Sequence, residues 1–175
     1  MSLTNPINSQ PEPLYASDST IGRQIALQTL YEVDIARHDA LTVLLRHLHM
    51  QEPPARAARM ARILVLGVDA HRARLDLAVS QRASEFPIEL LAVIDRNVLR
   101  IALYEFAVWG VTPIAVAIDE AVELAKDFAA EGAPGFINGV LRSIAQDTAL
   151  VEAMRTDPNT PDEAAARAAV STDED

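Results

Sequence analysis

The sequence contains no cysteine, a single lysine and few aromatic residues, and these shortages narrow what the protein can be. Without cysteine, disulfides and thiolate chemistry are excluded from all 175 residues. Aromatic residues make up 5% of the chain, so alanine, leucine, isoleucine and valine must supply its apolar core. That composition favours helices packed on helices, because alanine and leucine lose little entropy on entering a helix.

Long apolar runs are also missing. No uninterrupted apolar stretch approaches the roughly 18 residues that would span a bilayer. Residues 1–10 are polar and lack the basic and apolar regions of a signal peptide. We therefore expect a cytoplasmic protein with no membrane contact.

The net charge of −10 argues, taken alone, against binding to nucleic acid. Much of the acid lies near the ends, however: residues 151–175 hold seven acidic residues and two arginines, and residues 1–20 hold two acidic residues and no base. Fourteen of the fifteen basic residues are arginine, which prefers phosphate and carboxylate partners. Genome composition explains the same bias equally well, so charge alone does not decide the function.

Prolines and capping residues divide the chain into three predicted parts. Residues 1–18 form a flexible arm, residues 19–148 a helical domain, and residues 149–175 an acidic tail that we expect to be disordered. Candidate caps are Asp18, Ser19 or Thr20 for the first helix and Asp39 for the second. Apolar periodicity predicts helices over 21–37, from Asp39 to Pro53, and over 55–81, 88–109, 114–129 and 136–146. The segment 88–109 is predicted as a short helix followed by a longer one.

Two helices carry informative faces. The helix after Asp39 has a predicted apolar stripe formed by Leu41, Leu44, Leu45 and Leu48. On the next helix, one face is predicted to be basic, with Arg56, Arg59 and Arg62.

The segment from Ile94 to Phe106 is apolar nearly all round, which is typical of a buried central helix. Charge interrupts it at Asp95, Arg96, Arg100 and Glu105. Because an unpaired buried charge is costly, we expect these residues to form ion pairs or to lie at an interface.

No pattern in the chain indicates catalysis or a metal site. His47 and His49 are two apart on a predicted helix, so their side chains diverge and cannot share a metal. Asp119 and Glu120 are adjacent and also diverge, so we expect one to face solvent and the other to bond to a neighbouring helix. We predict no catalytic residue, no metal ligand and no cofactor.

Four segments, in order, resemble the NusB family of transcription antitermination proteins. The first is Arg23–Tyr31 (RQIALQTLY), and the second is Ile94–Phe106 (IDRNVLRIALYEF). The third is Pro113–Phe128 (PIAVAIDEAVELAKDF), and the fourth is Phe136–Leu141 (FINGVL). Together they cover roughly residues 21–147.

The resemblance implies an all-α fold, a compact bundle of about seven helices in two small sub-bundles. It also implies a factor that binds boxA RNA of ribosomal-RNA leader transcripts together with NusE, a ribosomal protein. That complex joins RNA polymerase and suppresses early termination, without catalysis or cofactor. Some relatives form a homodimer that hides the RNA surface.

Six positions take a role from the resemblance. Arg23, Glu131 and Phe136 match RNA-binding positions, so Arg23→Ala is expected to weaken RNA binding without changing helicity. Tyr31, Glu89 and Asp95 match positions of the NusE contact. The Phe136 ring could stack on an unpaired base, a contact worth about 1–3 kcal/mol. Packing against the core in the first helical turn explains a phenylalanine at this position equally well.

Two more residues of the fourth segment take a structural prediction. We expect Asn138 to be a buried amide that ties helices together, and Gly139 to mark a close backbone approach.

Two departures from the family pattern bear on RNA affinity. The arginines that precede Arg23 in better-known members are replaced here by Ser19–Gly22, and the acidic residue after Glu131 is replaced by Gly132. Fewer basic contacts predict weaker RNA binding and a shallower salt dependence. The missing arginines keep open the alternative of a dimeric interaction scaffold without RNA binding. A second alternative is an RNA-binding module like the front domain of ribosomal-RNA cytosine methyltransferases, which the same helical fold resembles.

Overall fold

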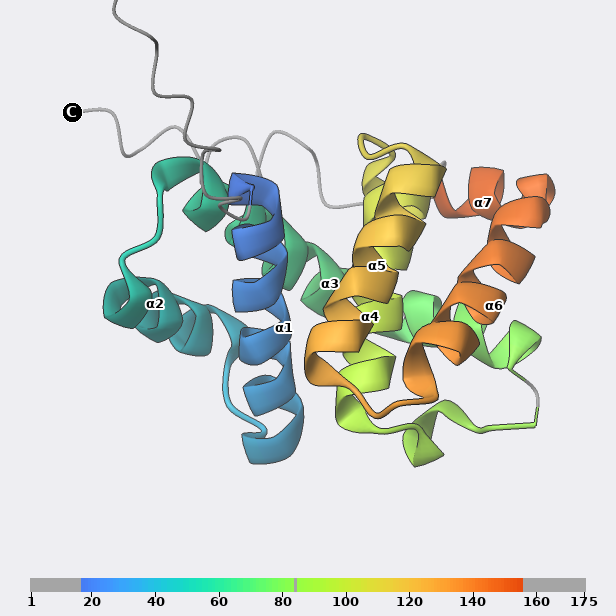
Figure 1. Cartoon of the computed structure of the whole chain (residues 1–175), viewed down its shortest axis with the longest axis horizontal. Helices are drawn as coiled ribbons and strands as arrows, with labels where there is room; N and C mark the ends of the chain where they lie inside the picture. Colours follow the sequence, from blue (N-terminus) through green and yellow to red (C-terminus); the bar gives the residue numbers. More distant parts are fainter. Residues whose placement is uncertain (1–16, 84, 156–175) are drawn as a thin grey trace, which may run out of the picture.

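The computed structural model describes residues 17–83 and 85–155, and all regular elements in these ranges are helical (Figure 1). This confirms the predicted all-α class. In chain order the elements are α1 (Asp18–Ala36), α2 (Ala40–Gln51), α3 (Ala55–Arg82), the 3₁₀ turn η1 (Ile88–Leu90), α4 (Val93–Leu103), the π-helix η2 (Tyr104–Trp109), α5 (Ile114–Phe128), α6 (Ala133–Gln146) and α7 (Thr148–Arg155).

The helices form two groups that share α3. Helices α1 to α3 pack together, and α4 to α7 form the second group beside them (Figure 1). The 28-residue α3 is long enough to contact α1 and α2 in one group and α4, η2 and α6 in the other. Helix α1 also packs on α4, so the two groups bury a continuous apolar core.

Side-chain caps fix where the first two helices begin. The hydroxyl of Ser17 accepts a hydrogen bond from the Thr20 amide at 3.1 Å, so the cap of α1 lies one residue before the predicted candidates. The predicted cap Asp39 is confirmed, since its carboxylate accepts from the Thr42 amide at 2.9 Å. Arg37 ends α1 in a left-handed conformation with φ 54°.

The apolar stripe predicted on α2 is half wrong. Leu44 and Leu48 are buried as expected, but Leu41 and Leu45 are 47% and 48% exposed. Ala40 and Val43 complete the buried face instead. The buried face of α2 is therefore rotated toward these two smaller residues.

The predicted central helix is confirmed, with one change of geometry. Its α-helical part, α4, is buried from Asn97 to Leu103 and continues directly into the π-helix η2. Gly110, which has a left-handed backbone with φ 68°, ends the π-helix. Its amide donates a hydrogen bond to the carbonyl of Glu105 at 3.0 Å. Gly67 of α3 lies so close to the Tyr104 ring that a Cβ atom has no room there.

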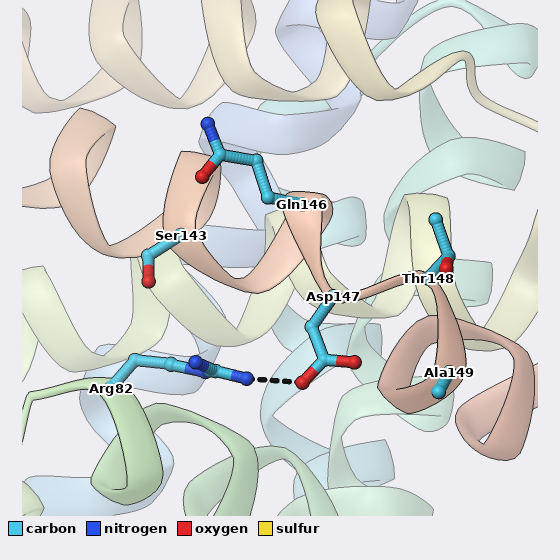
Figure 2. Close-up of a pocket in the computed structure, with 6 residues that line it drawn as sticks. All are labelled: Arg82, Ser143, Gln146, Asp147, Thr148 and Ala149. Atoms are coloured by element: carbon cyan, nitrogen blue, oxygen red, sulfur yellow. Dashed lines mark hydrogen bonds and ion pairs between the residues drawn. The ribbon is translucent and has the colours of Figure 1, made fainter.

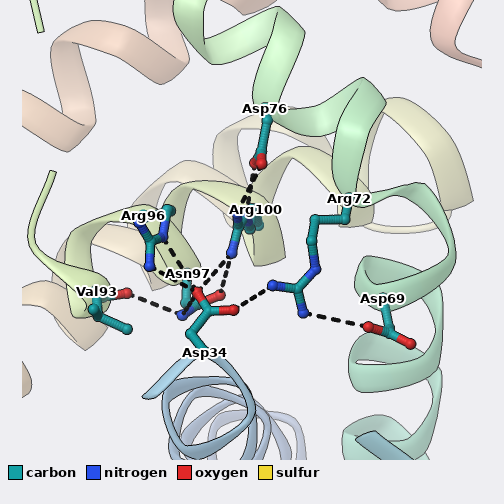
Figure 3. Close-up of polar contacts among 8 residues, drawn as sticks. All are labelled: Asp34, Asp69, Arg72, Asp76, Val93, Arg96, Asn97 and Arg100. Carbon is teal, nitrogen blue, oxygen red and sulfur yellow. Dashed lines mark hydrogen bonds and ion pairs between the residues drawn. The ribbon is translucent and has the colours of Figure 1, made fainter. Parts of the chain in front are cut away.

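A buried acidic residue of α1 ties the helix groups together (Figure 3). The side chain of Asp34 is 4% exposed and pairs with Arg72 of α3 and with Arg96 and Arg100 of α4. Arg100 also pairs with Asp76 at 2.7 Å. Burial alone would raise the pKa of Asp34, but the Arg72 hydrogen bond and the arginine charges outweigh it and lower that pKa.

The first residues of the predicted tail, 149–155, are helical instead. Residues 148–155 form α7, which buries Val151 and Met154 and packs against η2. The Asp147 carboxylate accepts from the Leu150 amide at 3.0 Å, which caps the helix start. The remaining residues of the predicted tail, and residues 1–16 of the predicted arm, lie outside the described residues.

Candidate functional site

Arg23 lies buried between α1, η2 and α5. Its guanidinium donates to both carboxylate oxygens of Glu105, at 2.9 and 2.7 Å. A third nitrogen lies 3.1 Å from the carboxylate of Glu120, which also accepts from the Thr20 hydroxyl. Burial alone would lower the pKa of Arg23, but hydrogen bonds and charges from these two carboxylates outweigh it and raise the pKa.

This placement does not fit the direct phosphate contact expected for Arg23. Its side chain is 6% exposed, and two carboxylates already occupy the guanidinium. It fits the other expectation, that charges around the central helix form ion pairs, since Glu105 is 1% exposed and also accepts from Thr112 at 2.9 Å. Glu120 likewise bonds to a neighbouring helix while Asp119 is exposed, as predicted for that pair.

The turn between α5 and α6 carries the other two predicted RNA residues. Glu131 is exposed and has no partner among the described residues. The ring of Phe136 is partly buried against the core and meets the ring of Phe86 edge to face, with centroids 6.1 Å apart. Around Gly132 and Gly135 nothing lies within 4 Å of where a Cβ would stand, so this surface is open.

Phe86 was missed by the sequence reading. It is 52% exposed and lies between α3 and η1, where its amide donates to the carbonyl of Ala83 at 2.9 Å. Its position in the sequence, directly before Pro87 in a short connection between helices, indicates an aromatic side chain near the surface. Together the rings of Phe86 and Phe136 form an aromatic pair at the surface.

The three predicted protein-contact residues are accessible. Tyr31 on α1 is 43% exposed, and Glu89 in η1 is exposed. Asp95, in the first turn of α4, is half-buried and pairs with no described residue, and burial raises its pKa. It is thus the one charge of the central helix that the protein leaves unpaired in the described structure.

The structure groups these six residues differently from the sequence prediction. Arg23 meets the middle of α5 through Glu120, whereas Glu131 and Phe136 lie beyond the end of α5, about 12 Å further along the helix axis. That end of α5 lies at the same edge of the molecule as η1 and the start of α4 (Figure 1). Through its ring contact with Phe86, Phe136 lies beside the connection that leads into η1, which carries Glu89.

The structural roles predicted for Asn138 and Gly139 are wrong. Asn138 is partly exposed and accepts a hydrogen bond from Arg142 of its own helix at 2.9 Å. Gly139 is exposed, with nothing within 4 Å of a Cβ built there. The buried amide that ties helices is Asn97 instead, which donates to the Asp34 carboxylate at 3.1 Å and to the Val93 carbonyl at 3.0 Å.

Two open pockets lie on the second group of helices. One, of about 400 Å³, is lined by polar residues where α6 meets α7, and an ion pair between Arg82 and Asp147 crosses it (Figure 2). The other, of about 470 Å³, runs between α5 and α6 and includes Lys126 and Gly135 in its lining. None of the six predicted residues lines either pocket.

The described part of the chain holds neither a candidate metal site nor a candidate membrane-spanning helix. Within residues 17–83 and 85–155, acidic and histidine side chains do not gather into a group of three that could hold a metal ion. In the same ranges, no helix is both long and apolar enough to cross a membrane.

Comparison with known proteins gives one consistent family. The family model described as NusB family matches residues 20–146. Transcription antitermination protein NusB of Dehalococcoides mccartyi is 44% identical over 124 residues, which are 71% of this chain and 87% of that protein.

Solved structures agree on the fold. A structure of T. maritima NusB is 30% identical, with a TM-score of 0.69 over 77% of this chain and 94% of that one. The chain of a crystal structure of antitermination factors NusB and NusE in complex with double-stranded RNA also has a TM-score of 0.69, over 74% of this chain and 96% of that one. At 23% identity this second likeness shows the fold alone.

Proposed function

The chain belongs to the NusB family, and we propose that it is a transcription antitermination factor that binds boxA RNA together with NusE. In this proposal the RNA-bound pair joins RNA polymerase during synthesis of ribosomal-RNA leaders. The observation that carries the proposal is the match to the NusB family over residues 20–146, which include nearly all of the described domain.

On the protein side, we assign the NusE contact to Tyr31, Glu89 and Asp95. Tyr31 and Glu89 are exposed, and Asp95 is a half-buried carboxylate without a described partner. A basic group of a partner would supply the missing positive charge at Asp95, and such charge complementarity favours orientation and a fast encounter. Because partial burial raises the pKa of Asp95, a nearby cation would lower it again on binding.

On the RNA side, we assign direct contact to the turn that carries Glu131 and Phe136. The Phe136 ring is held edge to face by Phe86, and the glycines beside it leave room for a base to approach. Arg23 acts indirectly in this proposal, because its ion pairs with Glu105 and Glu120 hold the start of α1 against η2 and α5.

A crossed experiment separates the two assigned surfaces. Labelled boxA RNA is titrated with the protein alone and with NusE of the same organism, at two salt concentrations, and NusE binding is measured separately. Phe136→Leu keeps apolar volume against the core but removes the ring face, so RNA affinity should fall about 5- to 150-fold while NusE binding stays unchanged. Asp95→Asn keeps the side-chain size and removes the charge, so NusE binding should weaken while RNA binding by the protein alone stays unchanged.

Three results would contradict parts of this proposal. Equal RNA affinity of the Phe136→Leu variant would reduce Phe136 to a packing residue. Equal NusE affinity of the Asp95→Asn variant would remove Asp95 from the contact. Absence of boxA-selective binding, with and without NusE, would favour the interaction scaffold, and sedimentation of the same samples would show whether a homodimer replaces the RNA complex.

A further inference from the structure

Two arginines on α3 stand out because nothing in the described structure neutralises them. Arg56 and Arg59 lie three residues apart in the first turns of α3, so they project from the same side of the helix. Both are exposed, and neither makes an ion pair within residues 17–83 and 85–155. The first turn of α3 contains no acidic residue.

These arginines flank the start of α1. Helix α1 crosses α3 at Gly22, where a Cβ would lie 2.6 Å from the Cβ of Met60 and 2.8 Å from the carbonyl oxygen of Ala57. Arg56 and Arg59 are the chain neighbours of those two contact residues. The first turns of α1 and α3 accordingly lie close together at one edge of the molecule (Figure 1).

The start of α1 itself offers no free positive charge. Its one arginine, Arg23, is buried and shared between two carboxylates. The first turn also carries the acidic Asp18, while Ser19 and Thr20 are neutral hydrogen-bonding residues. Any phosphate that lies along this edge must therefore be neutralised by other cations, and Arg56 and Arg59 are placed to do so.

We infer that Arg56 and Arg59 contact the phosphate backbone of the bound RNA beside the start of α1. The inference rests on the proposed function, and it adds a phosphate-binding surface on a different helix. Guanidinium groups suit this role because they bind phosphate oxygens in pairs and keep their charge at all physiological pH values. Contacts to phosphate position the RNA and carry no sequence preference.

The test is RNA affinity as a function of salt for the double variant Arg56→Gln/Arg59→Gln. The control, Arg37→Gln/Arg142→Gln, removes the same charge from two exposed arginines that make no described ion pair and lie at the far end of α1 and on α6. The probes are a labelled single-stranded RNA carrying boxA and one of scrambled sequence. Circular dichroism and the urea midpoint check that both variants stay folded.

The double variant should lose affinity for both RNAs. Each phosphate contact on a single strand releases about 0.7 counterions. The loss of two contacts should therefore lower RNA affinity roughly 10- to 15-fold at about 0.15 M salt. The slope of log affinity against log salt should become shallower by about 1.4. The control should keep the slope of the unmodified protein.

The outcomes separate this inference from the proposed function. Equal slopes for the double variant, its control and the unmodified protein would overturn the inference and leave boxA binding intact. Equal loss in both variants would also overturn it, since the effect would then be one of net charge. Failure of the unmodified protein to bind RNA, alone and with NusE, would contradict both proposals.

Discussion

Replacing Arg23 with alanine removes the cation that faces a buried carboxylate. Glu105 is 1% exposed and is held by two hydrogen bonds from Arg23, at 2.9 and 2.7 Å. After the substitution only the Thr112 hydroxyl, at 2.9 Å, remains as its described partner. The sequence alone led us to expect weaker RNA binding at unchanged helicity, but burial makes stability the first property to change.

The expected loss follows from the cost of an unpaired buried charge. Removing one partner of a buried ion pair typically costs about 3–5 kcal/mol. At about 4 °C per kcal/mol for a domain of this size, the melting temperature should fall by roughly 12–20 °C. Urea unfolding followed by circular dichroism measures the free energy, and a thermal scan gives the melting temperature.

Two variants control this prediction. Arg142→Ala makes the same change at an exposed arginine and should alter stability by less than about 0.5 kcal/mol. Arg23→Met/Glu105→Gln removes both charges and should recover part of the loss, because no unpaired charge stays buried. If Arg23→Ala unfolds at the same urea concentration as the unmodified protein, the buried pair is not a stabilising contact and the reasoning fails.

Three further predictions concern the packing of the helices. The pKa of Asp34 is lowered in the folded protein, so its ion pairs stabilise the fold above the unfolded-state pKa of about 4, and this stabilisation is lost as the pH falls through the lower folded-state pKa. Asp34→Asn should therefore cost about 3–5 kcal/mol of unfolding free energy at pH 7. Below about pH 4 the urea midpoint of this variant should fall less steeply than that of the unmodified protein. Gly67→Ala should lower the unfolding free energy by about 1–3 kcal/mol, because a Cβ at this position meets the Tyr104 ring. Gly139→Ala, at an open helical position, should instead stabilise the protein by about 0.5–1 kcal/mol. Equal urea midpoints for the two variants would contradict this packing. Met154→Ala should cost about 2–5 kcal/mol in the same assay, and no change would show that α7 is not packed on the core.

Local patterns in the sequence were enough to predict helices α1 to α6. Proline and capping residues act over a few positions, which is why Asp39 was identified as a cap and the central helix as buried. The charges on that helix were expected to pair, and Arg96, Arg100 and Glu105 do so.

Features that depend on contacts between distant residues were not predictable in the same way. The burial of Arg23 depends on Glu105 and Glu120, which are about 80 and 100 positions away, and periodicity on α1 carries no trace of them. The tail prediction was wrong for residues 149–155, because the acidic, proline-interrupted sequence outweighed the two apolar residues, Val151 and Met154, that pack α7 against the core and η2.

The roles of the site residues are also a property of three-dimensional placement. The sequence placed Arg23 and Phe136 in one RNA-binding set, but the structure separates them along α5 and puts Phe136 beside Phe86. An aromatic pair between residues 50 positions apart has no local signature. Only the juxtaposition of α6 with the connection before η1 reveals it.

The most direct test of the central claim is transcription past a terminator in vitro. A ribosomal-RNA leader template with intact boxA is transcribed by RNA polymerase of the same organism with the other antitermination factors, with and without this protein. The account predicts that adding the protein raises read-through, and that a template with mutated boxA shows no rise. Read-through that is the same with and without the protein, or that rises equally on both templates, would contradict a boxA-dependent antitermination function.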